Sequence, residues 1–451
     1  MNERRPPGTD LSRLPRELAD RWTKPFARFL LIETAGGAIL LVFTIAALAL
    51  SNSPWSHPFL DFWETPVVLQ FGAVDFGRSL KDWINDGLMT LFFFLVALEL
   101  KRELVLGELS NPRMAALSIA SAIGGMLLPA GLYLALQSGQ PGGHGWGTVM
   151  ATDTAFVVGC LALLGSRIPP SLRVFMLSLA IVDDLGAILV VAIGYSDPIV
   201  WSALGLAVLG LAVVRGMALI GIRGFPSYFL VGGLIWIAVD ASGIHATVTG
   251  VILGLMTPAR RWVSDRRLYA ILDRVVAHPA AEEGGSGDTP DRKTLQVAEV
   301  AARETLSPVE RLEIGLHPWV GFAIMPLFAF ANAGLPLSWS DLGHSVTWAV
   351  FAGFALGKPI GVVAFAWLAV RSGIAIRPVE LGWGFLVGGG LLAGIGFTMA
   401  LFIADQAFTD ELINGAKLGI FLASVASAAA GMAALRWLPS NQHYAGHVEQ
   451  A

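Results

Sequence analysis

Long apolar runs alternate with short polar connections along most of the chain. The runs hold about 20 residues each, which is enough for a helix to cross a hydrocarbon core about 30 Å thick. They recur from about residue 28 to about residue 438, with centres near residues 40, 92, 125, 157, 183, 206, 228, 250, 327, 359, 395 and 425. The pattern predicts an all-α membrane protein with twelve transmembrane helices.

The polar segments divide the chain into one integral domain and its flanks. Residues 28–438 are expected to form the twelve-helix domain, between a charged leader at 1–27 and a tail at 439–451. The leader has no small-residue cleavage site behind a short apolar core, so it does not resemble a cleaved signal peptide. A polar loop at about 259–316 interrupts the domain, and its part from 279 to 310 is predicted to be flexible with at most one short helix.

Lysine and arginine mark every second connection between the apolar runs. The opposite connections at 138–147, 195–198 and 335–345 contain neither residue. This alternation follows the positive-inside rule and predicts that both termini are cytoplasmic. The basic residues of the cytoplasmic connections are Lys101, Arg102, Arg113, Arg167, Arg173, Arg215, Arg223, Arg260, Arg371 and Arg377.

The outer connection at 52–81 differs from the others, because it is long and contains Arg78 and Lys81. Its stretch at 66–76 has strand-forming residues on both sides of Gly72, which predicts a small outer β-hairpin.

Composition agrees with a membrane protein. The 451 residues are 55% hydrophobic and 14% charged, and the mean hydropathy is +0.64. The net charge of -4 and the scattered basic residues give no reason to expect a nucleic-acid partner. The single cysteine, Cys160, excludes an internal disulfide and leaves no thiol cluster for a metal.

Four ionisable residues interrupt the apolar runs. The stretch LAIVDDLGAILV places Asp183 and Asp184 side by side, Asp153 lies in the preceding run, and Lys358 lies in a later one. Asp153 and Asp183 are equally far from the turn near residue 168, so antiparallel helices would hold them at one depth. That depth is about 18 Å from the cytoplasmic end at 1.5 Å per residue, close to the bilayer midplane. The four groups are therefore predicted to converge.

A charge at that depth costs about 3 kcal/mol or more, so it marks an ion pathway, a proton relay or a structural ion pair. Three carboxylates and one lysine leave an excess of negative charge, which favours a mobile cation. Neighbouring helix positions point about 100° apart, so one of Asp183 and Asp184 can meet Lys358 while the other opens onto a cavity. Hard oxygen ligands suit Na⁺ or Li⁺, and protons compete for the same oxygens.

Glycine-rich stretches suggest that two of the predicted spans are broken. Thr152 and Asp153 follow GWGTVM, and Gly394 and Gly396 lie in LVGGGLLAGIGFTMALF. Glycines at the midplane can unwind a helix and present its ends to an ion. They can equally allow close helix packing, and the sequence leaves both interpretations open.

Two other functional classes need comparison. An intramembrane aspartyl protease would use two carboxylates such as Asp153 and Asp183, but it would not require Lys358, and a Gly-Asp pair occurs only in the polar loop at Gly287. A proton-coupled symporter for a small metabolite would need aromatic or arginine side chains at the depth of the aspartates, and none can be assigned there.

Several motifs resemble the NhaA family of bacterial Na⁺/H⁺ antiporters, in collinear order over about residues 30–438. They are ATDTAF (151–156), LAIVDDLGAI (179–188), GKPIG (357–361) and GIGFTMALFIA (394–404), supported by WINDGLM (83–89), LVALELKREL (95–104), GIHATVTGVILG (243–254), HPWVGFAIMPLFAFANAG (317–334) and ELINGAKLGI (411–420). The resemblance implies an inverted-repeat fold with two discontinuous crossing helices. NhaA is itself a standard example of this transporter architecture.

The resemblance also implies roles for the buried residues. Asp183 and Asp184 would bind Na⁺ and protons, and Lys358 would pair with one of them, which the sequence does not specify. Thr152, Asp153, Gly394 and Gly396 would form the helix crossing and balance its charge. The expected activity is electrogenic exchange of cytoplasmic Na⁺ or Li⁺ for external H⁺, rising at alkaline pH, without enzymatic catalysis or a cofactor.

A cytoplasmic pH-response cluster is implied at Glu99, Arg102, Glu103, Glu313 and His317. Without the resemblance, LKREL would be interpreted as a snorkelling helix end. The chain departs from the family at Ile314, where a second histidine is common, and in the polar insertion at 279–310.

His245 is expected to be a packed histidine. The expected environment is the bilayer of the bacterial inner membrane, with a homodimer formed through the hairpin at about 66–76.

Overall fold

The computed structural model describes residues 33–71, 74–196, 198–222, 224–277, 290–336 and 338–438. The predictions for the leader at 1–27 and the tail at 439–451, and those that concern Gly72, Arg223 and Gly287, lie outside the described residues.

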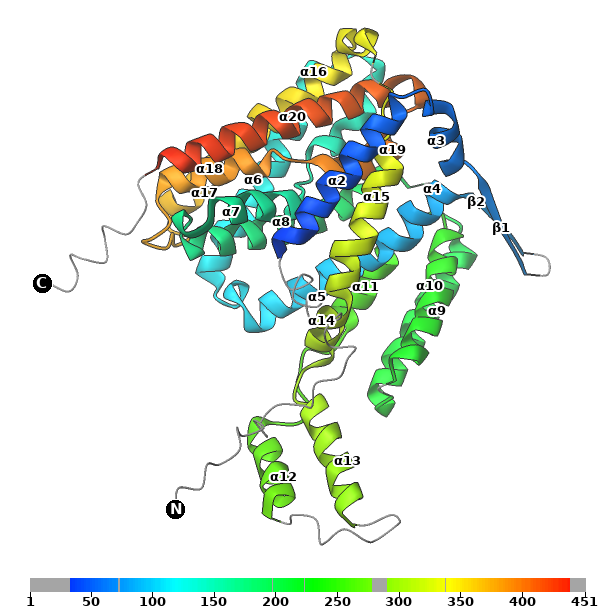
Figure 1. Ribbon diagram of the computed structural model, residues 1–451, viewed down its shortest axis with the longest axis vertical. Coiled ribbons are helices and arrows are strands. Elements are labelled where there is room, and N and C mark those ends of the chain that lie inside the picture. Colours follow the sequence, from blue (N-terminus) through cyan, green and yellow to red (C-terminus); the bar gives the residue numbers. More distant parts are fainter. Residues whose placement is uncertain are drawn as a thin grey trace, which may run out of the picture.

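Helices form nearly all of the described chain (Figure 1). The first half contains α2 (Glu33–Ser51), α3 (Ser56–Trp63), α4 (Leu80–Asp82), η1 (Trp83–Leu88), α5 (Met89–Leu106), η2 (Glu108–Ser110), α6 (Pro112–Leu136), η3 (Pro141–Val149), α7 (Thr154–Leu164), η4 (Gly165–Arg167), α8 (Pro170–Gly194), α9 (Trp201–Ile220), α10 (Phe225–Asp240) and α11 (Val248–Met256). The second half contains α12 (Asp265–Ala277), α13 (Pro290–Arg303), α14 (Pro308–Trp319), η5 (Val320–Ile324), α15 (Met325–Asn332), η6 (Trp339–Gly343), α16 (Ser345–Ala352), η7 (Gly353–Gly357), α17 (Lys358–Arg371), α18 (Trp383–Ala393), α19 (Phe397–Ala407) and α20 (Asp410–Trp437).

Eleven of the twelve predicted centres lie within these helices, and the centre near 395 lies between α18 and α19. Within the described residues, seven helices are long and apolar enough to cross a membrane, and ten segments are if each of three bent pairs counts as one. The helix at 225–240 is shorter, and α11 has only 9 residues. Length and composition therefore support seven to ten spans, while a count of twelve stays a prediction.

Both predicted helix breaks are present. η3 and α7 are bent by 46° around residues 150–153, and α18 and α19 are bent by 44° around Gly394 and Gly396. By contrast, Gly389 lies inside α18, where an added Cβ would come within 2.8 Å of the Met176 sulfur on α8. Both interpretations of the glycines are therefore right, each at different positions: some end a helix and others allow close packing.

The predicted hairpin is confirmed as a two-stranded antiparallel sheet. β1 (Pro66–Phe71) pairs with β2 (Val74–Ser79) in a register that sets Pro66 against Ser79 and Phe71 against Val74. The two strands project away from the helices (Figure 1). Their outer location follows from the predicted orientation of the chain.

The polar loop contains more helix than the sequence predicts. α13 is the one short helix expected within 279–310, but α12 precedes it and packs against it, and the pair extends beyond the end of α14 (Figure 1). A search for long apolar runs misses α12 because its apolar residues lie on one side of a largely charged helix.

The helices that hold the buried charges pack into one group. α6 lies along α17 and also contacts α8, while α16 and α18 both pack on α20. α5 packs along α11 and α14, while α9 and α10 pack on each other and α10 also contacts α11 (Figure 1). The two helix breaks and the middle of α8 therefore meet inside the molecule.

Candidate functional site

The predicted convergence of buried charges is present in the structure. The Asp183 and Asp184 side chains lie in the middle of α8, with 0% and 3% of their surface exposed. Asp153 lies in the break before α7, and Lys358 is the first residue of α17, and both are fully buried. The charges of Asp153, Asp183 and Lys358 all act on Asp184, so the four groups form one site.

Lys358 pairs with Asp183. Its Nζ lies 2.6 Å from Asp183 Oδ2, and it also donates to the carbonyl oxygen of Met150. This geometry answers the question that the sequence left open. Because adjacent helix positions diverge by about 100°, Asp184 points elsewhere, and the described residues include no ion-pair partner for it.

Asp153 lies where two helices begin. It is the N-terminal capping residue of α7 and accepts from the Phe156 N–H at 3.2 Å. Its other carboxyl oxygen accepts from the Thr398 N–H of α19 at 2.9 Å and from the Thr398 hydroxyl. Helix N-termini carry partial positive charge, so one carboxylate serves both. The backbone N–H of Asp153 donates to Ile395 O at 2.7 Å, which joins the two breaks directly.

The helix segments on the other side of each break present carbonyl oxygens. Lys358 takes the one from Met150, after η3. The Thr152 hydroxyl lies 2.6 Å from Asp183 Oδ2 and 3.0 Å from the last carbonyl oxygen of α18, that of Ala393. Carbonyl ends carry partial negative charge, which Lys358 offsets. The breaks thus hold fixed dipoles of both signs beside the aspartates.

Two oxygens of the site remain open. Oδ1 of Asp183 and Oδ1 of Asp184 are buried and have no hydrogen-bond partner within the described part of the chain. The Thr154 hydroxyl lies close to Asp184, with Oγ1 3.5 Å from Oδ2. A buried carboxylate oxygen without a donor is costly unless a proton or a cation neutralises it. The site can therefore hold one or the other.

The Tyr195 side chain contacts the backbone of the broken helix η3. Its hydroxyl accepts from the Gly147 N–H at 2.9 Å and donates to His144 O at 2.9 Å. Burial raises the pKa of Tyr195 to about 12, so the phenol keeps the proton that it donates. The contact ties η3 to the end of α8.

Three of the proposed pH-response residues are in contact with one another. Arg102 donates to Glu313 and lies 3.4 Å from Glu103. Glu99 lies one turn earlier on α5, and His317 lies one turn after Glu313 on α14. Ile314, in place of the second histidine, is 63% exposed and points away from the cluster.

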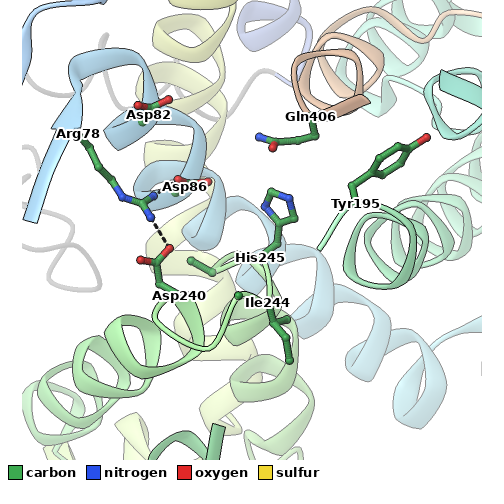
Figure 2. A pocket seen from close by; sticks show the side chains of 10 residues that line it. Arg78, Asp82, Asp86, Tyr195, Asp240, Ile244, His245 and Gln406 are labelled. Atoms are coloured by element: carbon green, nitrogen blue, oxygen red, sulfur yellow. Dashed lines mark hydrogen bonds and ion pairs between the residues drawn. The ribbon is translucent and has the colours of Figure 1, made fainter. Parts of the chain in front are cut away.

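A second cluster of polar side chains lines a cavity of about 190 Å³ elsewhere in the molecule (Figure 2). Arg78 lies between Asp86 and Asp240, 2.5 Å from the latter. His245 lines this cavity, half-buried, beside Gln406 (Figure 2). This polar setting was not evident from the sequence, which predicted a packed histidine.

The sequence analysis missed four contributors to the main site. Thr154 and Thr398 lie within the quoted motifs, but a threonine in an apolar run is too common to stand out. Met150 and Ala393 contribute backbone carbonyls, which no residue type signals. The side chains that carry charge were found, as was Thr152, but these four other polar groups were not.

The fold and the site define a class: helical membrane proteins whose broken spans hold buried ionisable groups, as ion transporters do. The family described as Na⁺/H⁺ antiporter 1 matches residues 27–435. The chain therefore belongs to this family, a family of transporters rather than enzymes.

Three curated relatives carry the name Na⁺/H⁺ antiporter NhaA. NhaA 2 of Acidiphilium cryptum is 65% identical over 94% of this chain and 95% of its own length. NhaA of Rhizobium meliloti is 62% identical over 95% and 98%. NhaA 2 of Vibrio vulnificus is 54% identical over 96% and 97%.

Proposed function

We propose that this protein exchanges cytoplasmic Na⁺ or Li⁺ for external H⁺ across the bacterial inner membrane, without a cofactor. The observation that carries the proposal is the pair of buried, unpartnered oxygens on Asp183 and Asp184. The proposal includes twelve crossings in an inverted repeat, with η3/α7 and α18/α19 as two broken helices that cross. Both termini would be cytoplasmic.

In the proposed cycle, a cation entering from the cytoplasm displaces protons from the aspartates and binds between them. In the structure Lys358 compensates Asp183, since Nζ lies 2.6 Å from its carboxylate. Asp184 depends on the transported ion for its neutralisation. A rearrangement then exposes the site to the outside, where protons displace the cation.

We further propose that more protons enter than Na⁺ ions leave, so that exchange is electrogenic. Two carboxylates that can each take a proton, against one bound cation, are consistent with this ratio. Activity would rise at alkaline pH, with Arg102, Glu103 and Glu313 as the contacting part of the pH-response cluster and Glu99 and His317 nearby.

Everted membrane vesicles from cells without other Na⁺/H⁺ antiporters test the proposal. Respiration acidifies the vesicle lumen and quenches a weak-base dye, and added Na⁺ or Li⁺ should then restore the fluorescence, more strongly at alkaline than at neutral pH. K⁺ at the same ionic strength serves as the control cation. No Na⁺-dependent recovery relative to vesicles without the protein, at any pH, would refute the proposal.

A further inference from the structure

Thr154 is a polar residue of the main site to which no role has been given. It is the first residue of α7, directly after Asp153. Its hydroxyl lies 3.5 Å from Asp184 Oδ2, on the carboxylate that has no lysine partner. We propose that Thr154 Oγ1 is a direct ligand of the transported cation and helps to set the affinity for Na⁺. This inference rests on the proposed function.

A hydrogen bond alone does not explain the contact. An O–H···O bond is most often about 2.7–2.8 Å long, so 3.5 Å is too far for a strong one. The neighbouring Thr152 shows what a bond in this site looks like, at 2.6 Å from Asp183. Thr154 therefore lies close to Asp184 without forming a strong hydrogen bond to it.

The separation suits two ligands of one cation. Ca²⁺, an ion of nearly the radius of Na⁺, holds oxygens at about 2.3–2.6 Å, and two such oxygens at a right angle lie about 3.4 Å apart. Thr154 Oγ1 and Asp184 Oδ2 have that spacing. A cation between them would have a neutral oxygen on one side and a charged one on the other.

The rest of a coordination shell is available nearby. Oδ1 of Asp184 and Oδ1 of Asp183 are both buried and lack donors in the described chain. All these groups are hard oxygen ligands, the type that suits Na⁺ and Li⁺. By contrast, Asp183 Oδ2 is occupied by Lys358 and Thr152. The oxygens left for a cation are therefore Oδ1 of each aspartate, together with Asp184 Oδ2 and Thr154 Oγ1.

Steady-state exchange in everted vesicles tests this ligand. Thr154→Val removes the hydroxyl at nearly constant volume, and we expect the apparent KM for Na⁺ to rise about tenfold, with the maximal rate within about twofold of wild type. Thr154→Ser keeps an oxygen and should retain a KM close to that of wild type. Thr148→Val is the matched control, because Thr148 is also buried, before the same break, and its hydroxyl has no described partner.

A purely structural threonine gives a different result. It would lower the maximal rate or the protein level and leave the KM for Na⁺ unchanged, and this outcome would overturn the inference. So would a Thr154→Ser protein as impaired as Thr154→Val. Should Thr154→Val fail to reach the membrane, Thr154→Ala removes the same hydroxyl.

Calorimetric titration of Na⁺ into purified protein decides the question independently of transport. The Kd of Thr154→Val should exceed that of wild type by about the same factor as the KM. Equal Kd values would overturn the ligand role even if exchange is confirmed. If wild type binds Na⁺ but moves no protons in exchange, the proposed function fails while the ligand role can still hold.

Discussion

Lys358 contacts Asp183 and the Met150 carbonyl oxygen at once. In a medium that solvates charge poorly, this arrangement satisfies two acceptors with one ammonium. Asp153 is likewise satisfied by donors at two helix starts. Asp184 is the exception, with one oxygen unpartnered and one near a hydroxyl. In the proposed exchange, Asp184 gains its neutralising partner from the transported ions.

The ion pair between Lys358 and Asp183 can be tested by replacing Lys358 alone and then both residues together. Lys358→Met leaves Asp183 and the Met150 carbonyl without their donor, which should lower the free energy of unfolding by about 3–5 kcal/mol. Adding Asp183→Asn removes the uncompensated charge and should restore part of that loss. Thermal melting of the purified proteins in detergent measures both. If the double variant loses as much stability as the two single variants combined, the assigned pairing would be contradicted.

Residue types in the sequence predict which charged residues form this site, but not which of them pair. A charge within an apolar run is conspicuous, so Asp153, Asp183, Asp184 and Lys358 were all identified. The partner of Lys358 depends on how α8 and α17 are rotated about their axes. That rotation is set by packing over many residues, so no local pattern predicted it.

At the scale of elements, close helix contact holds the site in place. α6 and α17 approach so closely that a Cβ on Gly124 would meet the carbonyl oxygen of Gly361 and the Phe365 ring. Gly125, next along α6, faces Val362 and the Lys358 side chain. The contact therefore sets the height at which Lys358 reaches Asp183.

Gly124→Ala should weaken this contact. A backbone carbonyl cannot rotate away as a side chain can, so we expect a loss of about 1–3 kcal/mol in stability. Gly131→Ala is the matched control on α6, because nothing lies within 4 Å of its added Cβ. Melting temperatures in detergent should fall for Gly124→Ala alone. Equal melting temperatures would show that the helices can separate without cost.

Element prediction succeeded where the apolar pattern is long. The breaks at Asp153 and at Gly394 and Gly396 were found because glycine and polar residues interrupt apolar runs. α12 was missed because an amphipathic helix outside the membrane has no long apolar run. α11 was expected as a full span, yet its helix covers only Val248–Met256.

At the scale of the whole molecule, polar contacts join helices that lie far apart in the sequence. Lys81, at the start of the helix that continues into α5, lies 2.5 Å from Asp405 on α19. Asn85 also donates to Asp405 at 3.0 Å and exchanges amide hydrogen bonds with Asn332 on α15. The broken helix α18/α19 is thus fastened at one end to helices that do not carry the aspartates.

The hairpin of β1 and β2 is the predicted dimer contact. Replacing residues 68–77 by a short glycine linker joins Val67 to Arg78, which are cross-strand neighbours, so the Arg78 ion pairs should survive. We expect monomers in chemical crosslinking of membranes, with Na⁺/H⁺ exchange retained because Asp183 and Asp184 are untouched. Dimers that persist after the deletion would place the contact elsewhere.

The central claim is that Asp184 holds the transported cation. Purified wild-type protein and Asp184→Asn, reconstituted in liposomes at matched protein levels, can be compared by uptake of radioactive Na⁺ driven by an imposed pH gradient. The account predicts rapid uptake by wild type and no uptake above that of protein-free liposomes by Asp184→Asn. Uptake by Asp184→Asn at the wild-type rate would contradict it.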